Sequence, residues 1–316
     1  MMAAGRVRRA VAAVWRGGLK KKILTILVAL CAAAVIALIA HRVMSIGKNR
    51  WEDVARIEMV HVEGGTFLMG CTEEQGDDCF KNEKPPVSMT VRDYQIGKYP
   101  VTQGQWKAVM GGNPSFFNTQ NLLKALCDNV YRDVYPPMRG LWNFLRWAYP
   151  HARGLWKFVM GNNLKWNDRW PVESVCWDDA QVFIERLNAQ TGKKYRLPTY
   201  AEWEYVARGG NKSKGYKYSG SNDAGKVAWY NSKYKRNYTT HPVGKKMVNE
   251  LGIYDMSGNV WELAAGSFNF RGRDYGLACG GGWNCNDARS VRIPSVFPVD
   301  TDLKNNYIGF RLALDP

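Results

Sequence analysis

From Ile57 onward the chain consists of short apolar runs separated by glycine, and this pattern restricts the fold more than any other feature. Met59–Val62 and residues 66–69 are two such runs, and Gly64-Gly65 separates them. Runs of this length are typical of short strands joined by tight turns, because glycine adopts backbone angles that other residues avoid. Strands do not alternate with helices, which argues against a doubly wound parallel sheet. The pattern predicts an α+β domain with little regular secondary structure, and mostly loops after Gly209.

Three segments have the pattern of helices. Residues 102–110 form the first and residues 178–190 the second, which has apolar residues at helical spacing. The third is Tyr200–Ala207. Thr199 is its predicted cap, and Glu202 stands three residues further on, where it completes a capping box.

The formal net charge of +16 suggests nucleic acid or a membrane surface as a partner only if the charge is spread over the fold. Residues 1–50 hold ten basic side chains and no acidic one, and residues 116–170 hold eight basic and three acidic ones. The rest of the chain has a net charge of +1. No nucleic-acid-binding motif accompanies these charges, so we expect no nucleic-acid partner.

The first 56 residues predict a membrane anchor. Residues 23–40 contain Thr25 as their only clearly polar side chain and are long enough to cross a bilayer as a helix. Seven basic residues precede this run and three follow it, which places residues 1–22 in the cytoplasm. Residues 41–56 then form a stalk, and the folded part is periplasmic or extracellular. The alternative is a cleaved signal peptide, for which Ala32-Ala33-Ala34 offers a cleavage pattern.

Six cysteines lie outside the apolar run, an even number that suits disulfides in an exported domain. Cys71 and Cys79 bracket a short polar loop, and we expect them to be bonded to each other. Neither a zinc-type cysteine spacing nor a catalytic triad is visible, and the four histidines lie far apart.

Residues 116–170 form a basic, Trp-rich stretch that looks inserted. Residues 139–144 resemble residues 153–158, and residues 155–163 resemble residues 105–113. One interpretation is a module that docks to a membrane face or a partner. The other is a packed insertion with buried Trp rings and solvated Arg heads.

Seven groups of residues occur in a recognisable order along the chain. They are VEGGTFLMG at 62–70, KYPVT at 98–102, PVE at 171–173 with WDDA at 177–180, YRLPT at 195–199 with EWE at 202–204, GIYDMSGNVWE at 252–262, GGGW at 280–283 and GFRL at 309–312. Together they resemble the formylglycine-generating enzyme family, whose domain is also called the sulfatase-modifying-factor domain. The resemblance covers residues 57–315 apart from the inserted stretch, and it implies one domain with a C-type-lectin-like core.

The resemblance implies copper chemistry in the active family members, in which two cysteines hold the copper that converts a sulfatase cysteine to formylglycine. The matching positions here are Cys285 and Ser290, so the second thiol is missing. Gly282 and Asn286 also depart from the serine and histidine of the family. A serine hydroxyl is a poor ligand for Cu(I), which prefers soft thiolates. We therefore expect no copper and expect Cys285 to be a buried thiol or to be bonded to Cys279. The alternative is a copper- and oxygen-dependent oxidoreductase that uses Cys285.

The resemblance also implies a structural calcium ion. The matching ligands are the carboxylates of Asp255 and Glu262 and the backbone carbonyls of Gly258 and Val260. Oxygen ligands on a tight glycine turn suit a hard cation, so we expect calcium here. The alternative is that these acids cap turns without a metal. A second calcium site of the family is not carried over, because Val227 stands where the family has asparagine.

With the copper pair lost, the resemblance predicts a membrane-anchored, extracytoplasmic protein that binds a protein or a glycan through its C-terminal loops at 284–306. The residues predicted to contact the ligand are Trp283, Asn284, Asn286, Arg289, Arg292, Asn305, Asn306 and Tyr307. In a subclass that resembles the variable proteins of diversity-generating retroelements, the same segment is the diversified face. A further alternative is a structural partner that holds an envelope complex together through residues 116–170.

Overall fold

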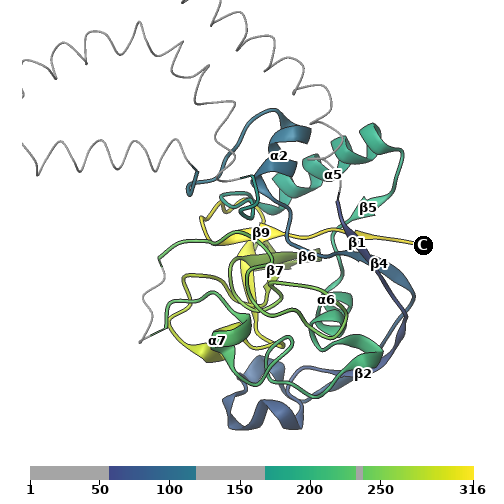
Figure 1. Ribbon diagram of the computed structural model, residues 1–316, viewed down its shortest axis with the longest axis vertical. Coiled ribbons are helices and arrows are strands. Elements are labelled where there is room, and N and C mark those ends of the chain that lie inside the picture. The colour runs from purple at the N-terminus through teal and green to yellow at the C-terminus, as the bar shows by residue number, and fades with distance from the viewer. Residues whose placement is uncertain (1–56, 119–167, 233–237) are drawn as a thin grey trace, which may run out of the picture. The chain divides into compact units, whose positions relative to one another are not determined.

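The computed structural model describes residues 57–118, 168–232 and 238–316. The predicted anchor and stalk, at 1–56, and most of the inserted stretch, at 119–167, lie outside the described residues. Within the described ranges, no helix is long and apolar enough to cross a membrane. The arrangement of the described helices and strands is shown in Figure 1.

The C-terminal half of the chain forms a four-stranded central sheet in the order β8-β7-β6-β9. Its strands are β6 (Trp261–Phe270), β7 (Arg273–Cys279), β8 (Val296–Asp300) and β9 (Ile308–Phe310). β6 pairs antiparallel with β7 and parallel with β9. The prediction of mostly loops after Gly209 did not anticipate these strands, although most described residues beyond Gly209 do lie outside helices and strands. Gly266 and Gly276 interrupt the apolar runs of these strands, so the strands become evident only once they pair.

A second four-stranded sheet joins the two ends of the domain, in the order β1-β4-β10-β5. Its strands are β1 (Met59–Val62), β4 (Tyr94–Gly97), β10 (Ala313–Leu314) and β5 (Tyr195–Arg196). β10 pairs with both β4 and β5, so the end of the chain is held between earlier strands (Figure 1). β2 (Gly65–Met69) and β3 (Val87–Val91) form a separate two-stranded sheet.

All three predicted helices are present, with ends shifted by at most one residue. They are α2 (Gln103–Met110), α5 (Trp177–Thr191) and α6 (Tyr200–Ala207), and a further short helix is α7 (Ala224–Val227). The predicted capping box of α6 is confirmed. Glu202 donates its backbone N–H to Thr199 Oγ1 at 3.2 Å, and its carboxylate accepts the Thr199 N–H at 2.8 Å.

The central sheet separates two clusters of buried apolar side chains. Leu263 and Ala278 belong to one cluster, and their neighbours Ala264 and Cys279 belong to the other. Successive residues of a strand point to opposite faces of a sheet. Buried apolar side chains therefore cover both faces of the central sheet where these four residues lie. Trp203 of α6 is fully buried in the second cluster.

The predicted disulfide between Cys71 and Cys79 is confirmed. It closes a loop that contains the short 3-10 helix η1 (Glu73–Asp78), and η2 (Lys81–Glu83) follows. Buried Arg208 holds the start of this loop by donating to the Gly70 carbonyl at 2.6 Å and to Thr72 Oγ1 at 2.8 Å. The disulfide therefore closes the loop, and Arg208 attaches the loop to the body of the domain.

Candidate functional site

Cys285, the remaining copper-type cysteine, is a buried free thiol that is 8% exposed. Its Sγ accepts the backbone N–H of Gly282 at 3.3 Å. Burial raises the pKa of this thiol to about 11, so little thiolate is present at neutral pH to bind a soft metal or attack a substrate. Cys279 is also free, which makes the expected alternative of a Cys279–Cys285 disulfide wrong. The two thiols belong to different core clusters, on opposite faces of the central sheet.

Ser290, the residue at the second copper position, lies in the 3-10 helix η5 (Ala288–Val291). Its backbone N–H donates to the Asp287 carbonyl at 3.1 Å, which forms the first turn of that helix. In the part of the chain that the structure describes, no group of three or more His, Cys, Asp or Glu side chains could hold a metal ion. One buried thiol and one serine hydroxyl do not fit a Cu(I) ion that requires two thiolates.

The predicted calcium loop is a tight turn in which Asp255, Gly258 and Asn259 all have positive φ, at 58°, 78° and 69°. Asp255 is 3% exposed, and its Oδ2 accepts the backbone N–H of Gly244 at 2.7 Å. Its Oδ1 is buried and has no hydrogen-bond partner among the described residues. Burial raises the pKa of this carboxyl to about 6. An unpartnered buried carboxylate oxygen fits either a cation or a proton.

Glu262, the second predicted calcium ligand, has both carboxylate oxygens engaged. Arg311 donates Nε to Oε2 at 2.5 Å and Nη2 to Oε1 at 2.6 Å, and Trp203 donates Nε1 to Oε2 at 2.8 Å. Both members of the ion pair are buried. The carboxylate of Glu262 therefore does not fit the predicted role of calcium ligand in this arrangement.

Trp283 and Asn306, two of the predicted ligand-contacting residues, are brought together by the fold. The indole Nε1 of Trp283 donates to the backbone carbonyl of Asn306 at 2.8 Å. The next residue, Tyr307, accepts the backbone N–H of Trp261 at 2.8 Å and so fixes this loop to β6. The Asn305 carbonyl accepts the Ser174 N–H at 2.9 Å.

The loop after Trp283 is fixed in a similar way. Asn286 is exposed, and its Oδ1 accepts Nδ2 of Asn231 at 2.6 Å. Asn284 Oδ1 is buried without a hydrogen-bond partner among the described residues. We call the six residues of these two loops the C-terminal surface: Trp283, Asn284, Asn286, Asn305, Asn306 and Tyr307.

Arg292 does not belong to an exposed binding face, contrary to the sequence prediction. It is completely buried and donates Nη2 to both oxygens of Glu83, at 2.9 and 3.0 Å. Arg289 also turns toward the disulfide loop, where its Nε donates to the Asp78 carbonyl at 3.3 Å and its guanidinium lies 4.9 Å from the Phe80 ring centroid. These two arginines therefore connect the C-terminal segment to the residues in and next to the disulfide loop.

Two aromatic residues next to the C-terminal surface were missed by the sequence analysis. Phe117 meets the Trp283 ring edge-on at 5.2 Å between centroids, and Phe116 meets Phe117 at 5.1 Å. Completely buried Glu173 accepts the backbone N–H groups of Phe116 and Phe117, at 3.1 and 2.9 Å. The sequence shows Glu173 as part of a family motif, but gives no sign that it holds the backbone where the inserted stretch begins.

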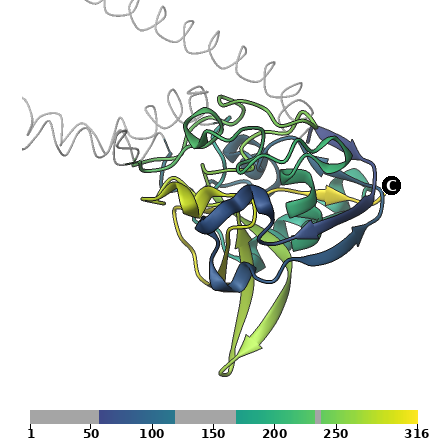
Figure 2. The same ribbon diagram turned by 90° about the horizontal axis from the view of Figure 1, so that it is seen from below.

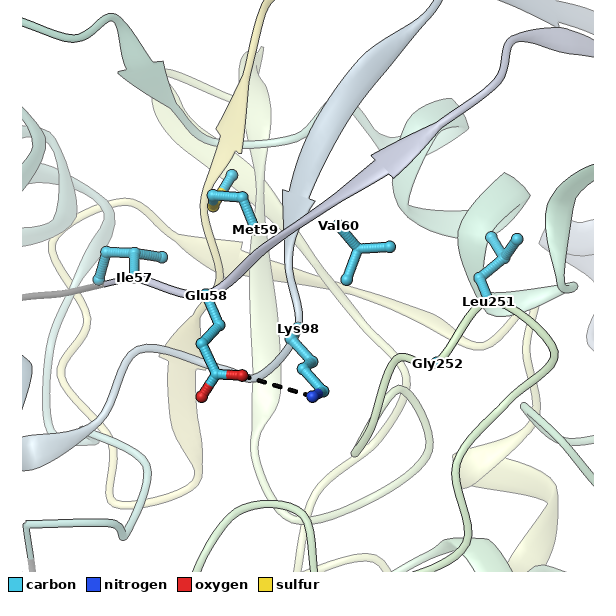
Figure 3. A pocket seen from close by; sticks show the side chains of 7 residues that line it. All are labelled: Ile57, Glu58, Met59, Val60, Lys98, Leu251 and Gly252. Atoms are coloured by element: carbon cyan, nitrogen blue, oxygen red, sulfur yellow. Dashed lines mark hydrogen bonds and ion pairs between the residues drawn. The ribbon is translucent and has the colours of Figure 1, made fainter.

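A cavity of about 660 Å³ opens at the start of β1 (Figure 3). It is lined by Ile57, Glu58, Met59, Val60, Lys98, Leu251 and Gly252. Its two charged side chains are paired, with Lys98 Nζ 3.3 Å from Glu58 Oε2. None of the predicted site residues lines this cavity, so we do not treat it as part of the site.

The fold defines a formylglycine-generating-enzyme-like domain, and Ser290 stands where the resemblance places the second copper thiol. Residues 48–316 match the sulfatase-modifying factor enzyme 1-like domain. The chain therefore belongs to this family.

Relatives of this chain include a protein named as a chaperone, a protein named as an inactive enzyme and proteins named as formylglycine-generating enzymes. The chain is 36% identical over 221 residues to the chaperone protein LppX of Paenibacillus barcinonensis, covering 65% of this chain and 70% of that protein. It is 25% identical over 292 residues to the inactive C-alpha-formylglycine-generating enzyme 2 of Bos taurus, covering 86% and 93%. The crystal structure of CarF matches with a TM-score of 0.58 at 24% identity, covering 83% of this chain and 99% of CarF, which shows the shared fold.

Proposed function

We propose that this protein is a membrane-anchored, extracytoplasmic binding protein that uses the formylglycine-generating-enzyme fold without its copper chemistry. The observation that carries the proposal is the copper position itself. Cys285 is a buried thiol with a raised pKa, and Ser290 stands where the second thiolate is required. A single inaccessible thiol cannot reproduce a two-thiolate Cu(I) site.

We favour a protein as the ligand of the C-terminal surface. Trp283 and Asn286 combine a rigid aromatic ring with an adaptable hydrogen-bonding group, which is typical of protein-binding loops. Phe116, which is 55% exposed, adds apolar area at the edge of this surface. A relative named as a chaperone also supports a protein ligand over a glycan, because chaperones act on proteins.

A Cu(I) titration of the full-length protein against a competing chelator tests the loss of copper chemistry. We expect wild type and Cys285→Ser to give the same curve. Stoichiometric Cu(I) binding that disappears in Cys285→Ser and is accompanied by oxygen uptake would contradict the proposal and support the oxidoreductase alternative.

Photo-crosslinking in cells tests the C-terminal surface. A photoreactive phenylalanine analogue is placed at Phe116 and, as a matched control, at Phe297, a phenylalanine of β8 that is 45% exposed. We expect a discrete protein adduct from position 116 that weakens when Trp283→Ala is added, and no such adduct from position 297. The absence of an adduct at 116, or the same adduct from both positions, would contradict a protein ligand at this surface.

The proposed roles of the membrane anchor and of the inserted stretch rest on the sequence alone. An alkaline phosphatase fused after residue 56 should be active, since this reporter works only after export, whereas a fusion within residues 1–22 should be inactive.

Deletion of residues 118–155 tests the alternative role as a structural partner. If the protein with this deletion still associates normally with the membrane or its partners, that alternative fails.

Diversification of the C-terminal segment is a separate part of the proposal and is tested at the gene level. A reverse-transcriptase gene beside a near-copy of the coding region for residues 280–312 would support it. Identical coding sequences for this segment in independent isolates would contradict it.

The proposed ligands of calcium are the Asp255 carboxylate and the backbone carbonyls of Gly258 and Val260. Glu262 is not among them, because both of its carboxylate oxygens accept hydrogen bonds from Arg311. Three protein oxygens are fewer than the six to eight ligands that Ca²⁺ takes. We therefore propose a weak, largely hydrated calcium site whose contribution to folding is small.

A further inference from the structure

The ends of β6 and β7 project from the domain as a β-hairpin arm, which we define as residues 266–276 (Figure 2). The pairing of the two strands shifts between Leu263 and Ser267, and Gly266, in this irregular stretch, has φ of 94°. Residues 266–269 and 271–274 are exposed. The arm thus leaves the body of the domain at this bulge.

The turn at the tip of the arm determines which backbone groups face outward. Arg271 and Gly272 both have positive φ, at 54° and 79°, as in a two-residue type I′ turn. In such a hairpin, the pair flanking the turn exchanges hydrogen bonds, and the next pair, Asn269 and Asp274, directs its backbone groups outward. The Asp274 carbonyl indeed accepts the Thr301 N–H on the β8 side, at 3.1 Å. Asn269 and Ser267 therefore direct their backbone N–H and C=O groups away from β7 on the other side.

The outer edge of β6 is unpaired along the arm, as far as the described residues extend. β9 pairs only with residues 261–263, and the Ala265 N–H donates to the Pro198 carbonyl at 2.7 Å. Beyond Ala265, no strand or isolated β-bridge from the described residues pairs with this edge of β6. Residues 266–270 contain neither proline nor a charged residue, the devices that usually protect an edge strand. The opposite edge of the sheet carries such a device, Pro298 in β8.

Phe268 gives this open edge an apolar centre. Its side chain is 44% exposed and stacks on its cross-strand partner Tyr275, with ring centroids 5.8 Å apart. A solvated aromatic ring beside unpaired backbone groups combines the two features of an edge that accepts another strand: hydrogen-bonding capacity and apolar area to bury.

We propose that the arm pairs with the arm of a second copy of this chain, with the two β6 edges antiparallel and centred on Phe268. In this register, the outward groups of Ser267 meet those of Asn269 of the partner subunit, and the reverse pair forms as well. Phe268 then faces Phe268 of the partner subunit as a non-hydrogen-bonded pair, the closest approach in an antiparallel ladder. Two central sheets become one continuous sheet.

The charge distribution favours a second copy as the occupant of this edge. In the antiparallel register, the tip of one arm, which carries Arg271, Arg273 and Asp274, lies beside the base of the other arm. Arg273 also lies 4.0 Å from Asp300 of β8. Thr199 forms a bridge to Ala265 at that base and donates its N–H to Glu202. Glu202 belongs to a cluster with Arg196 and Asp315, which has two carboxylates for one guanidinium. A tip with a net charge of +1 therefore meets a cluster with a net charge of −1 at both ends of the symmetric pair.

Disulfide trapping of the full-length chain in mild detergent tests this register. Phe268→Cys should form a crosslinked dimer under mild oxidation well above the wild-type background, because this position faces its own copy. Phe297→Cys is the matched control, since the two phenylalanines are 44% and 45% exposed. Crosslinking no greater than background at 268, or equal at 268 and 297, would overturn the proposal.

Light scattering of charged variants gives a second readout that does not depend on cysteine chemistry. Phe268→Lys places a charge at the centre of the paired edge and should weaken dimerisation by at least about tenfold, whereas Phe297→Lys should leave it unchanged. A chain that is monomeric at every concentration, or two variants that dimerise alike, would refute the arm pairing. Neither variant alters the C-terminal surface, so the proposed binding function stands or fails independently.

Discussion

Glu262 of β6 and Arg311, just after β9, form a buried, two-pronged ion pair with contacts of 2.5 and 2.6 Å. Arg311 also donates to the Gly97 carbonyl of β4 at 2.9 Å, so one guanidinium links the two four-stranded sheets. Removal of one partner leaves an uncompensated buried charge, and Glu262→Ala should lower the free energy of unfolding by about 3–5 kcal/mol. Asp315→Ala breaks an exposed pair with Arg196 and should cost at most about 1 kcal/mol. Urea unfolding of both variants measures this difference, and equal midpoints would show that burial of the pair does not matter.

His241 should make stability depend on pH. Its ring stacks on Trp229 at 3.7 Å, and burial, with a smaller effect of Lys246, lowers its pKa to about 4. The unfolded chain, with a histidine pKa of about 6.5, binds a proton in the pH window from about 6.5 to 4 that the folded chain does not bind. The contribution of His241 to stability is therefore greatest above pH 6.5 and falls toward pH 4, by up to about 3 kcal/mol. Asp255, whose carboxyl pKa burial raises to about 6, contributes with the opposite sign, because the folded chain holds a proton between about pH 6 and 4 that the unfolded chain releases. His241→Gln should lose less stability than the wild type between pH 7 and pH 4, and His61→Gln, at an exposed position of β1, is the control.

Thiol labelling should distinguish buried from reactive cysteines. Cys176, Cys279 and Cys285 are all buried, and burial raises the pKa of each thiol. We expect peptide mapping to find none of the three alkylated in the folded protein at pH 8, and all three alkylated after denaturation. Rapid labelling of Cys285 in the folded state would show an accessible thiolate and would revive the oxidoreductase alternative.

Glu173 should control the backbone at the root of the inserted stretch. Its carboxylate accepts two backbone N–H groups and the Ser174 hydroxyl, the last at 2.8 Å. Glu173→Ala leaves these donors without an acceptor and should lower the free energy of unfolding by about 2–3 kcal/mol. Limited proteolysis should then cut more rapidly near Phe116. Glu185→Ala, at an exposed position of α5, is the control. Unchanged cleavage would mean that Glu173 does not hold this segment.

Calcium should have little effect on stability. With three protein oxygens available, we expect a dissociation constant of about 1 mM or weaker, and chelation should shift the thermal midpoint by less than about 2 °C. Differential scanning calorimetry with calcium and with chelator measures this shift, and Asp255→Asn should abolish whatever shift remains. A large, Asp255-dependent shift would show that Glu262 leaves Arg311 to bind the metal.

Features that depend on residues close together in the chain were predictable from the sequence. The capping box of α6 uses Thr199 and Glu202, three residues apart, and the disulfide joins Cys71 and Cys79 across a short loop. The family motifs likewise predicted the fold, because their order constrains which residues form the turns. The predicted loss of the copper pair rests on Ser290, a single residue identity in the sequence.

Features that depend on distant residues were decided by the tertiary structure alone. Arg292 has the sequence appearance of a surface residue, but its partner Glu83 lies 209 positions away, and their pairing buries both. Phe117 reaches Trp283 only because Glu173 fixes the backbone before the inserted stretch. Residue types and short-range spacing determined the turns, caps and missing thiol. Which charges are neutralised inside, and which edges and rings remain exposed, depends on contacts between segments that only folding brings together.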